Sequence, residues 1–181
     1  MWEVNEPKPV KLIIGILAAD EYSLQAALES TIAQFGEQDL SSQVFKFTQT
    51  EYYADQTGDN ILRQFVSFDK LIDPGELSKI KLKTNDIEEK LAKKLAMPFP
   101  RPVNLDPGMI EPAKLILAST KNFSHRIYIG KKIYAEVTLI FSKGQWKTFE
   151  YTFPDFRQPR YYDFFDKVRT RLVEQLRDKH S

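Results

Sequence analysis

The sequence predicts an α+β fold, in which a mixed, largely antiparallel sheet is packed by helices into a single-domain sandwich. Three observations lead to this prediction. An apolar run and helical patterns fill the first half of the chain, short alternating segments joined by turns fill the second half, and a long amphipathic stretch ends it. The 181 residues fit one domain (1–181), and we interpret the proline-rich segment 97–102 as a loop between its halves.

The first predicted elements lie before residue 51. The residues from Val10 to Ala18 are almost all apolar, which is typical of a central strand covered on both faces. Asp20 can cap the helix that follows, and Gly36 can end it. Residues 44–50 alternate between apolar and polar side chains, which predicts a strand.

Helices are expected between residue 60 and the proline-rich loop. Residues 60–71 are predicted to be helical because apolar side chains recur there at helical spacing, namely Ile61, Phe65 and Phe68. The segment Asp73-Pro-Gly-Glu76 combines a cap, a first-turn proline and a capping-box glutamate, and predicts a helix start. A second capping box, Asn85 with Glu88, predicts that another helix starts there.

The second half of the chain is rich in predicted strands. A strand at 114–118 precedes a hairpin formed by residues 126–129 and 133–141, and a further strand at 146–153 follows a tight turn. The chain then ends in a long helix over residues 159–177, whose aromatic and aliphatic side chains share one stripe.

The register of the hairpin follows from its pattern. Apolar side chains occupy the odd-numbered positions Ile127, Ile129, Ile133, Ala135, Val137, Leu139 and Phe141. These side chains are expected on one buried face if a loop with an odd number of residues, such as the three residues 130–132, connects the two strands. Arg126 then falls opposite Glu136, and Tyr128 falls opposite Tyr134.

Two interpretations of this cross-strand pair are open. In the first, Arg126 and Glu136 form an exposed ion pair that stabilises the fold by less than about 1 kcal/mol. In the second, the pair forms the floor of a pocket, with Arg126 as an anion clamp and Glu136 as the residue that orients it. Tyr128 and Tyr134 would then contribute to ligand binding.

A polar loop precedes the hairpin. The segment from Ser119 to His125 is either a turn built from serine and asparagine or a set of binding groups at a strand end, with Lys121 available for an anion. His125 is the only histidine before the C-terminal tail, and its ordinary pKa lies near neutrality. It is therefore either a hydrogen-bonded structural residue or a group that moves protons.

The segment Arg101–Gly108 contains two further candidates. Asp106-Pro-Gly108 is interpreted as a turn, although Asn104 and Asp106 can point together into a cleft. The polar segment Phe153–Arg157 is interpreted as structural. The sequence predicts no metal site, because Asp106 or Glu136 would have to join His125 without any HExxH-type spacing.

Composition excludes several classes of function. The chain has no cysteine, which removes thiolate chemistry and disulfides. A net charge of +1 does not favour nucleic acid as a partner. The longest apolar run is too short to span a membrane, and the N-terminus lacks the features of a secretion signal, so we expect a cytoplasmic protein. No particular cofactor is indicated.

Several segments of this sequence together resemble one family. They are Lys11–Ala18, Thr50–Tyr53, Arg101–Gly108, Leu117–Tyr128, Tyr134–Leu139 and Tyr151–Asp155. The sequence is similar to domain-of-unknown-function family 4416 over nearly its whole length. The resemblance implies a small prokaryotic protein, and it supplies neither an activity nor a residue-level site. Family members often carry the automatic label "GTP-binding protein".

The residues permit a test of that label. A P-loop requires G-x-x-x-x-G-K-[ST], because backbone N–H groups, a lysine and a hydroxyl together hold the phosphates and magnesium. The sequence contains no such segment, and Gly130-Lys131 is interpreted as a hairpin turn. GTP binding would therefore need another geometry.

Our leading hypothesis is a site for a small anionic molecule or nucleotide within residues 101–155. Arg126 and Lys121 would hold the charge, and His125, Glu136 or Asp106 would move protons if the protein also acts on the ligand. The alternatives are a non-catalytic protein-interaction domain, with contact residues Tyr52, Tyr53 and Trp146, and an RNA-binding domain that stacks bases on exposed tyrosines.

Overall fold

The computed structural model describes residues 2–48, 57 and 60–178. Its strands are β1 (Lys11–Ala18), β2 (Gln38–Ser41), β3 (Phe45–Lys46), β4 (Leu62–Phe68), β5 (Val103–Glu111), β6 (Lys114–Ser119), β7 (Ile127–Tyr128), β8 (Tyr134–Ser142) and β9 (Gln145–Thr148). Its α-helices are α1 (Glu21–Phe35), α3 (Leu77–Leu95) and α4 (Tyr162–Asp178). Short 3-10 helices are η2 (Pro74–Glu76), η3 (Pro154–Arg157) and η4 (Pro159–Tyr161).

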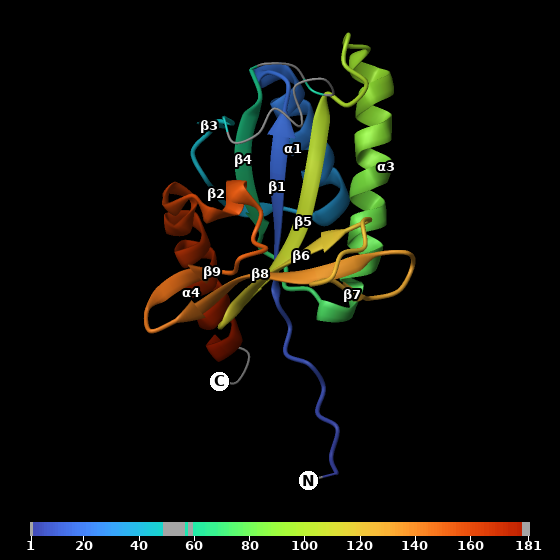
Figure 1. Cartoon of the computed structure of the whole chain (residues 1–181). Coiled ribbons are helices and arrows are strands. Elements are labelled where there is room, and N and C mark those ends of the chain that lie inside the picture. The colour runs from blue at the N-terminus through green and yellow to red at the C-terminus, as the bar shows by residue number, and fades with distance from the viewer. Residues whose placement is uncertain (1, 49–56, 58–59, 179–181) are drawn as a thin grey trace.

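Strand β1 lies in the middle of the sheet, and all of its residues are buried. The strand order is β2-β4-β1-β5-β6-β8-β7, with β3 paired to β4 and β9 paired to β8 (Figure 1). All of the pairings between these described strands are antiparallel. The predicted class is thus confirmed: an α+β domain with a largely antiparallel sheet, packed by helices and ending in a long C-terminal helix.

Two core clusters lie on opposite faces of the sheet. The even-numbered side chains of β1, such as Leu12 and Ile14, pack with α1 and α3, whereas Ile13 packs with the α4 side. Successive side chains of a strand point to opposite faces, so a strand covered on both sides needs apolar residues at every position. This arrangement explains the uninterrupted apolar run.

Residues 60–71 do not form the predicted helix, because strand β4 occupies their centre. Phe65 packs toward α4 and Val66 packs toward α1 and α3, so both faces of this strand are buried. The apolar residues of a strand covered on both faces need not alternate, and here they also fell at helical spacing. Arg63 obscured the pattern further, since it is a charged residue that is only 1% exposed.

Helix α3 runs unbroken through the predicted second helix start at Asn85 and Glu88, so that prediction is wrong. The capping-box spacing of i and i+3 also occurs within helices, and Glu88 uses its carboxylate for tertiary contacts instead. By contrast, Asp73 caps as predicted, since its Oδ1 accepts a hydrogen bond from the Gly75 N–H at 2.6 Å.

The segment Asp106-Pro-Gly108 is not the predicted turn but the middle of β5. Strand β1 pairs with all of β5 except its last residue, whereas β6 pairs with β5 only between Gly108 and Glu111. Pro107 has no N–H to donate to a ladder, which a strand tolerates where one edge has no partner. Strands β5 and β6 therefore diverge beyond Gly108 (Figure 1).

The predicted hairpin register is confirmed. Tyr128 pairs with Tyr134 across β7 and β8, and the Ile129 N–H donates to the Ile133 carbonyl at 3.0 Å. The loop 130–132 turns the corner with all three residues at positive φ. Arg126 and Glu136 consequently lie opposite each other, as the predicted register requires.

The prediction of a single buried face for the odd-numbered hairpin residues is wrong. Strand β8 bulges between Val137 and Leu139, which pair with successive residues of β6. A bulge inserts one residue and disturbs the alternation of faces. Ile133, before the bulge, therefore packs near the start of α3, whereas Leu139, after it, packs toward α4. Ile127 lies before the bulge on the edge strand β7, and it is 72% exposed.

The remaining predicted boundaries are adjusted at their ends. Strand β9 stops at Thr148, well before the predicted residue 153, and β3 covers only two residues of the predicted strand 44–50, whose last two residues lie outside the described ranges. The C-terminal helix begins as 3-10 turns and becomes α-helical at Tyr162. None of the described helices has both the length and the apolar character needed to cross a membrane.

Candidate functional site

A cleft of ≈ 360 Å³ opens beside the segment where β5 has left β6. Its walls come from β4, α3, β5, β6, β8 and the segments around residues 101, 120–126 and 153–156. The lining residues are Arg63, Lys81, Arg101, Asn104, Asp106, Leu117, Ala118, Ser119, Thr120, Lys121, Phe123, Arg126, Glu136, Phe153 and Phe156.

A buried charge cluster forms one wall of the cleft. Arg63 donates from Nε to Asp155 Oδ2 at 2.9 Å and from Nη2 to the same oxygen, while its Nη1 lies 3.1 Å from Asp106 Oδ2. Its guanidinium crosses the backbone of Gly15, where a Cβ atom would lie 2.9 Å from Arg63 Nη1. Glycine at position 15 therefore makes room for the arginine.

The charges of this cluster stabilise one another. Burial alone would lower the pKa of Arg63, but Asp155 and Asp106 more than offset burial and raise that pKa above its ordinary value. Burial would raise the pKa of Asp106, but Arg63 and Lys81 together lower it below its ordinary value. Asp106 is thus an ionised carboxylate near neutral pH.

Tyr161 completes the cluster by donating its hydroxyl to Asp155 Oδ1 at 2.8 Å. Burial, with the adjacent Asp155 carboxylate, raises the pKa of Tyr161 from 10.0 to about 12. Because the folded pKa is the higher one, this hydroxyl stabilises the fold fully below the unfolded pKa, and the contribution is lost as pH rises through about 12.

We expect an alkaline titration of phenolate absorbance to contain a tyrosine that ionises near pH 12. In Tyr161→Phe this component should disappear, with circular dichroism recorded in parallel to follow unfolding. Tyr22→Phe, at a position that is 70% exposed, should leave the component in place. An unchanged late component in Tyr161→Phe would contradict the assignment.

A second polar group connects α3 to β5 at the cleft. Lys81 Nζ donates to the Leu105 carbonyl at 2.9 Å, and Glu88 Oε1 accepts from the Leu105 N–H at 2.7 Å. Arg101 holds Glu88 Oε2 with Nε at 2.9 Å and Nη2 at 2.6 Å. Burial lowers the pKa of Lys81 and raises the pKa of Glu88, in each case against the attraction of its oppositely charged neighbours.

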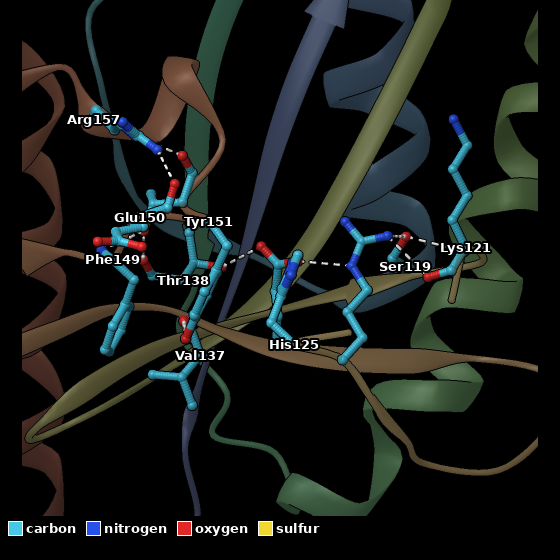
Figure 2. A network of polar contacts seen from close by, with 12 residues as sticks. Ser119, Lys121, His125, Val137, Thr138, Phe149, Glu150, Tyr151 and Arg157 are labelled. Atoms are coloured by element: carbon cyan, nitrogen blue, oxygen red, sulfur yellow. Dashed lines mark hydrogen bonds and ion pairs between the residues drawn. The ribbon is translucent and has the colours of Figure 1, made fainter. Parts of the chain in front are cut away.

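The predicted Arg126–Glu136 pair lies in the cleft wall. Arg126 Nε donates to Glu136 Oε2 at 2.7 Å, and Nη1 donates to Ser119 Oγ at 3.0 Å and to the Lys121 carbonyl at 2.9 Å. The Glu136 side chain is 5% exposed and that of Arg126 is 20% exposed. The pair is therefore partly buried, and its three contacts fix the guanidinium (Figure 2).

His125 approaches Glu136 from outside the cleft lining. Its Nε2 lies 3.0 Å from Glu136 Oε2, and its ring stacks on Tyr151 with centroids 4.2 Å apart. Thr138 Oγ1 donates to Glu136 Oε1 at 3.3 Å, and the Tyr151 hydroxyl donates to the Val137 carbonyl at 3.1 Å (Figure 2). These contacts hold Glu136 in place, and with it Arg126.

The structure brings six of the predicted site residues into the cleft lining: Asn104, Asp106, Ser119, Lys121, Arg126 and Glu136. Tyr128 and Tyr134 pack edge to face with ring centroids 5.5 Å apart, and they are not among the lining residues. Trp146, a predicted contact residue, is buried and donates to Asp166 at 2.9 Å. Tyr52 and Tyr53 lie outside the described residues.

Sequence reasoning missed Arg63, Lys81, Arg101 and the three phenylalanines Phe123, Phe153 and Phe156 as lining residues. It interpreted the segment of Asp155 as structural and did not anticipate that this carboxylate is fully buried against Arg63. An available signal was the presence of isolated charges, Arg63 and Asp155, within aromatic segments, since a buried charge requires a partner. In the described part of the chain, no group of three or more acidic or histidine side chains is arranged to hold a metal ion.

The fold and the cleft define an α+β protein with an antiparallel sheet that opens to form a charged cleft. The chain belongs to the family described as Domain of unknown function (DUF4416), whose model matches residues 8–172. This match confirms the family resemblance of the sequence. No curated protein and no solved structure matched the chain.

Proposed function

We propose that the cleft binds a small anionic molecule. The observation that carries this proposal is the charge of the lining, in which five residues are cationic (Arg63, Lys81, Arg101, Lys121 and Arg126) and two are carboxylates (Asp106 and Glu136). The chain as a whole has a net charge of only +1, so this concentration of cations is local. A cleft whose lining residues carry more positive than negative charges favours ligands of negative charge.

The cations fall into an inner and an outer group. Arg63 and Lys81 are nearly inaccessible and are held by Asp155, Asp106 and the Leu105 carbonyl, so they form the inner wall of the cleft. Arg126 and Arg101 have side chains that are 20% and 36% exposed, and both can reach a ligand. Lys121, the Ser119 hydroxyl and the Asn104 amide add polar groups at the same cleft.

Arg126 is the proposed anion clamp. Its guanidinium is already fixed by Glu136, Ser119 and the Lys121 carbonyl, so little conformational entropy is lost when a ligand binds. Asp106 and Glu136 each accept hydrogen bonds from an arginine, which favours an orienting role over proton transfer. This supports a binding site and leaves His125 as a positioning residue behind Glu136.

A nucleotide such as GTP would have to bind through these side chains, because the chain lacks a P-loop. The polyphosphate would then contact arginine and lysine side chains in place of a glycine-rich backbone loop. GTP with magnesium is accordingly one member of the ligand panel that tests the proposal.

We expect inorganic phosphate, ribose 5-phosphate or GTP to raise the melting temperature and to give saturable binding by calorimetry. Arg126→Ala should weaken this binding about 10–100-fold, since hydrogen bonds to charged groups contribute roughly 1.5–3 kcal/mol. The affinity of Arg126→Lys should fall between that of the unmodified protein and that of Arg126→Ala, because lysine keeps the charge and loses the planar guanidinium.

The matched control is Lys167→Ala, which removes a cation that is 63% exposed on α4, in an ion pair with Asp163. It should bind each probe as the unmodified protein does. Circular dichroism melts of both variants show whether a lost signal reflects unfolding. The proposal is wrong if no anion binds at millimolar concentration, or if Arg126→Ala and Lys167→Ala behave alike.

A further inference from the structure

The cleft also carries exposed aromatic rings. Of the 13 phenylalanines, all within the described residues, only Phe123 and Phe153 are exposed, at 65% and 38%. Both of them line the cleft. A single exposed apolar side chain is ordinary on a protein surface, but the coincidence of both exposed phenylalanines with one cleft requires an explanation.

Both rings are exposed even though each of them lies on an ordered segment. The Phe123 carbonyl accepts from the Arg126 N–H at 3.0 Å, which ties the Phe123 turn to the proposed anion clamp. The Phe153 carbonyl accepts from the Phe156 N–H at 2.9 Å at the start of η3, and Phe156 is itself buried in the cleft lining. Both rings are thus presented on hydrogen-bonded turns.

The surroundings of Phe123 leave most of its ring accessible. Its described ring neighbour is His125, with centroids 5.4 Å apart and a tilt of 49°, and His125 in turn stacks on Tyr151. A flat ligand ring can therefore stack on Phe123 while an anionic group reaches Arg126, since both residues line one cleft. Ring stacking is favourable and tolerant of ring identity.

We infer that the ligand of this cleft is an anion that carries a flat aromatic ring, such as an aryl or nucleobase-bearing phosphate, with Phe123 and Phe153 holding the ring. This inference rests on the proposed function and specifies its ligand class. Arg126, Lys121 and Arg101 bind the anionic group, and the two phenylalanines discriminate among anions by what is attached to them.

Three probes with one anionic group test the inference: phenyl phosphate, cyclohexyl phosphate and methyl phosphate. We expect NMR or calorimetric titration to show phenyl phosphate binding about tenfold more tightly than methyl phosphate, with cyclohexyl phosphate clearly weaker than phenyl phosphate. Phe123→Ala and Phe153→Ala should each reduce the advantage of phenyl phosphate and leave the binding of methyl phosphate unchanged.

Tyr22→Ala is the control, because it removes an aromatic side chain that is 70% exposed on α1 and does not line the cleft. It should bind all three probes as the unmodified protein does. Equal binding of the three phosphates would overturn the ring inference and leave anion binding standing, as would cyclohexyl phosphate matching phenyl phosphate. Absence of binding by all three would overturn the proposed function itself.

Discussion

Asp155→Asn is expected to lower the free energy of unfolding by about 3–5 kcal/mol, the cost typical of removing one partner from a buried ion pair. Asp155 is fully buried, and Arg63, at 1% exposure, retains its charge in the variant because a guanidinium is not deprotonated in proteins. The amide preserves size and one acceptor oxygen, so the loss isolates the carboxylate charge. Urea denaturation followed by circular dichroism measures the change.

Asp163→Asn provides the comparison for this variant. Asp163 also pairs with a cation, Lys167 at 2.7 Å, but its side chain is 78% exposed. Exposed pairs contribute about 0–1 kcal/mol because water screens both charges and the side chains lose entropy. If both variants lose the same amount of stability, Arg63 and Asp155 are not the buried pair that stabilises the region where β4 meets η3.

The second large effect is expected at Gly108, where β5 and β6 approach each other before they diverge. A Cβ atom there would lie 2.5 Å from the Ile116 carbonyl oxygen and 2.6 Å from Leu117 Cδ2. The carbonyl belongs to a paired strand and cannot move aside by a rotamer change. We therefore expect Gly108→Ala to destabilise the fold by about 3 kcal/mol, the upper end of the usual cost of overpacking.

Gly130→Ala separates steric cost from backbone cost. Gly130 lies in the hairpin loop with φ of +92°, and a Cβ atom there meets nothing within 4 Å. Its substitution should cost about 1–2 kcal/mol through left-handed strain alone. Urea denaturation of the two variants provides the measurement, and a Gly108→Ala protein as stable as Gly130→Ala would show that β5 and β6 separate easily at this point.

Local patterns in the sequence determined the elements that depend on short-range interactions. The apolar run identified β1, and the amphipathic stripe identified α4. The alternation of side chains, together with a three-residue loop, fixed the β7–β8 register. That register in turn placed Arg126 against Glu136, which the structure confirms at 2.7 Å. Four of the six predicted lining residues, namely Ser119, Lys121, Arg126 and Glu136, belong to this hairpin and the loop before it, whereas Asn104 and Asp106 came from the separate segment Arg101–Gly108.

Tertiary structure decided the features in which distant segments supply the physical cause. Arg63 can lie in a buried strand only because Asp155, 92 positions later in the chain, neutralises it. Asp106-Pro-Gly108 is extended because β1 provides its hydrogen-bonding partner, and Gly108 permits the close approach of β6. The bulge in β8 places Leu139 on the opposite face of the sheet from the one that alternation alone predicted.

The cleft depends both on local sequence patterns and on the tertiary structure. The sequence by itself determined the polar hairpin and loop that supply Arg126, Glu136 and Lys121, because strand pairing obeys a fixed period. Only the folded chain brings Arg63, Lys81, Arg101 and Phe153 to the cleft that this loop and hairpin line, since these residues come from separate segments. Their meeting depends on where β5 leaves β6, a long-range event that no local pattern encodes.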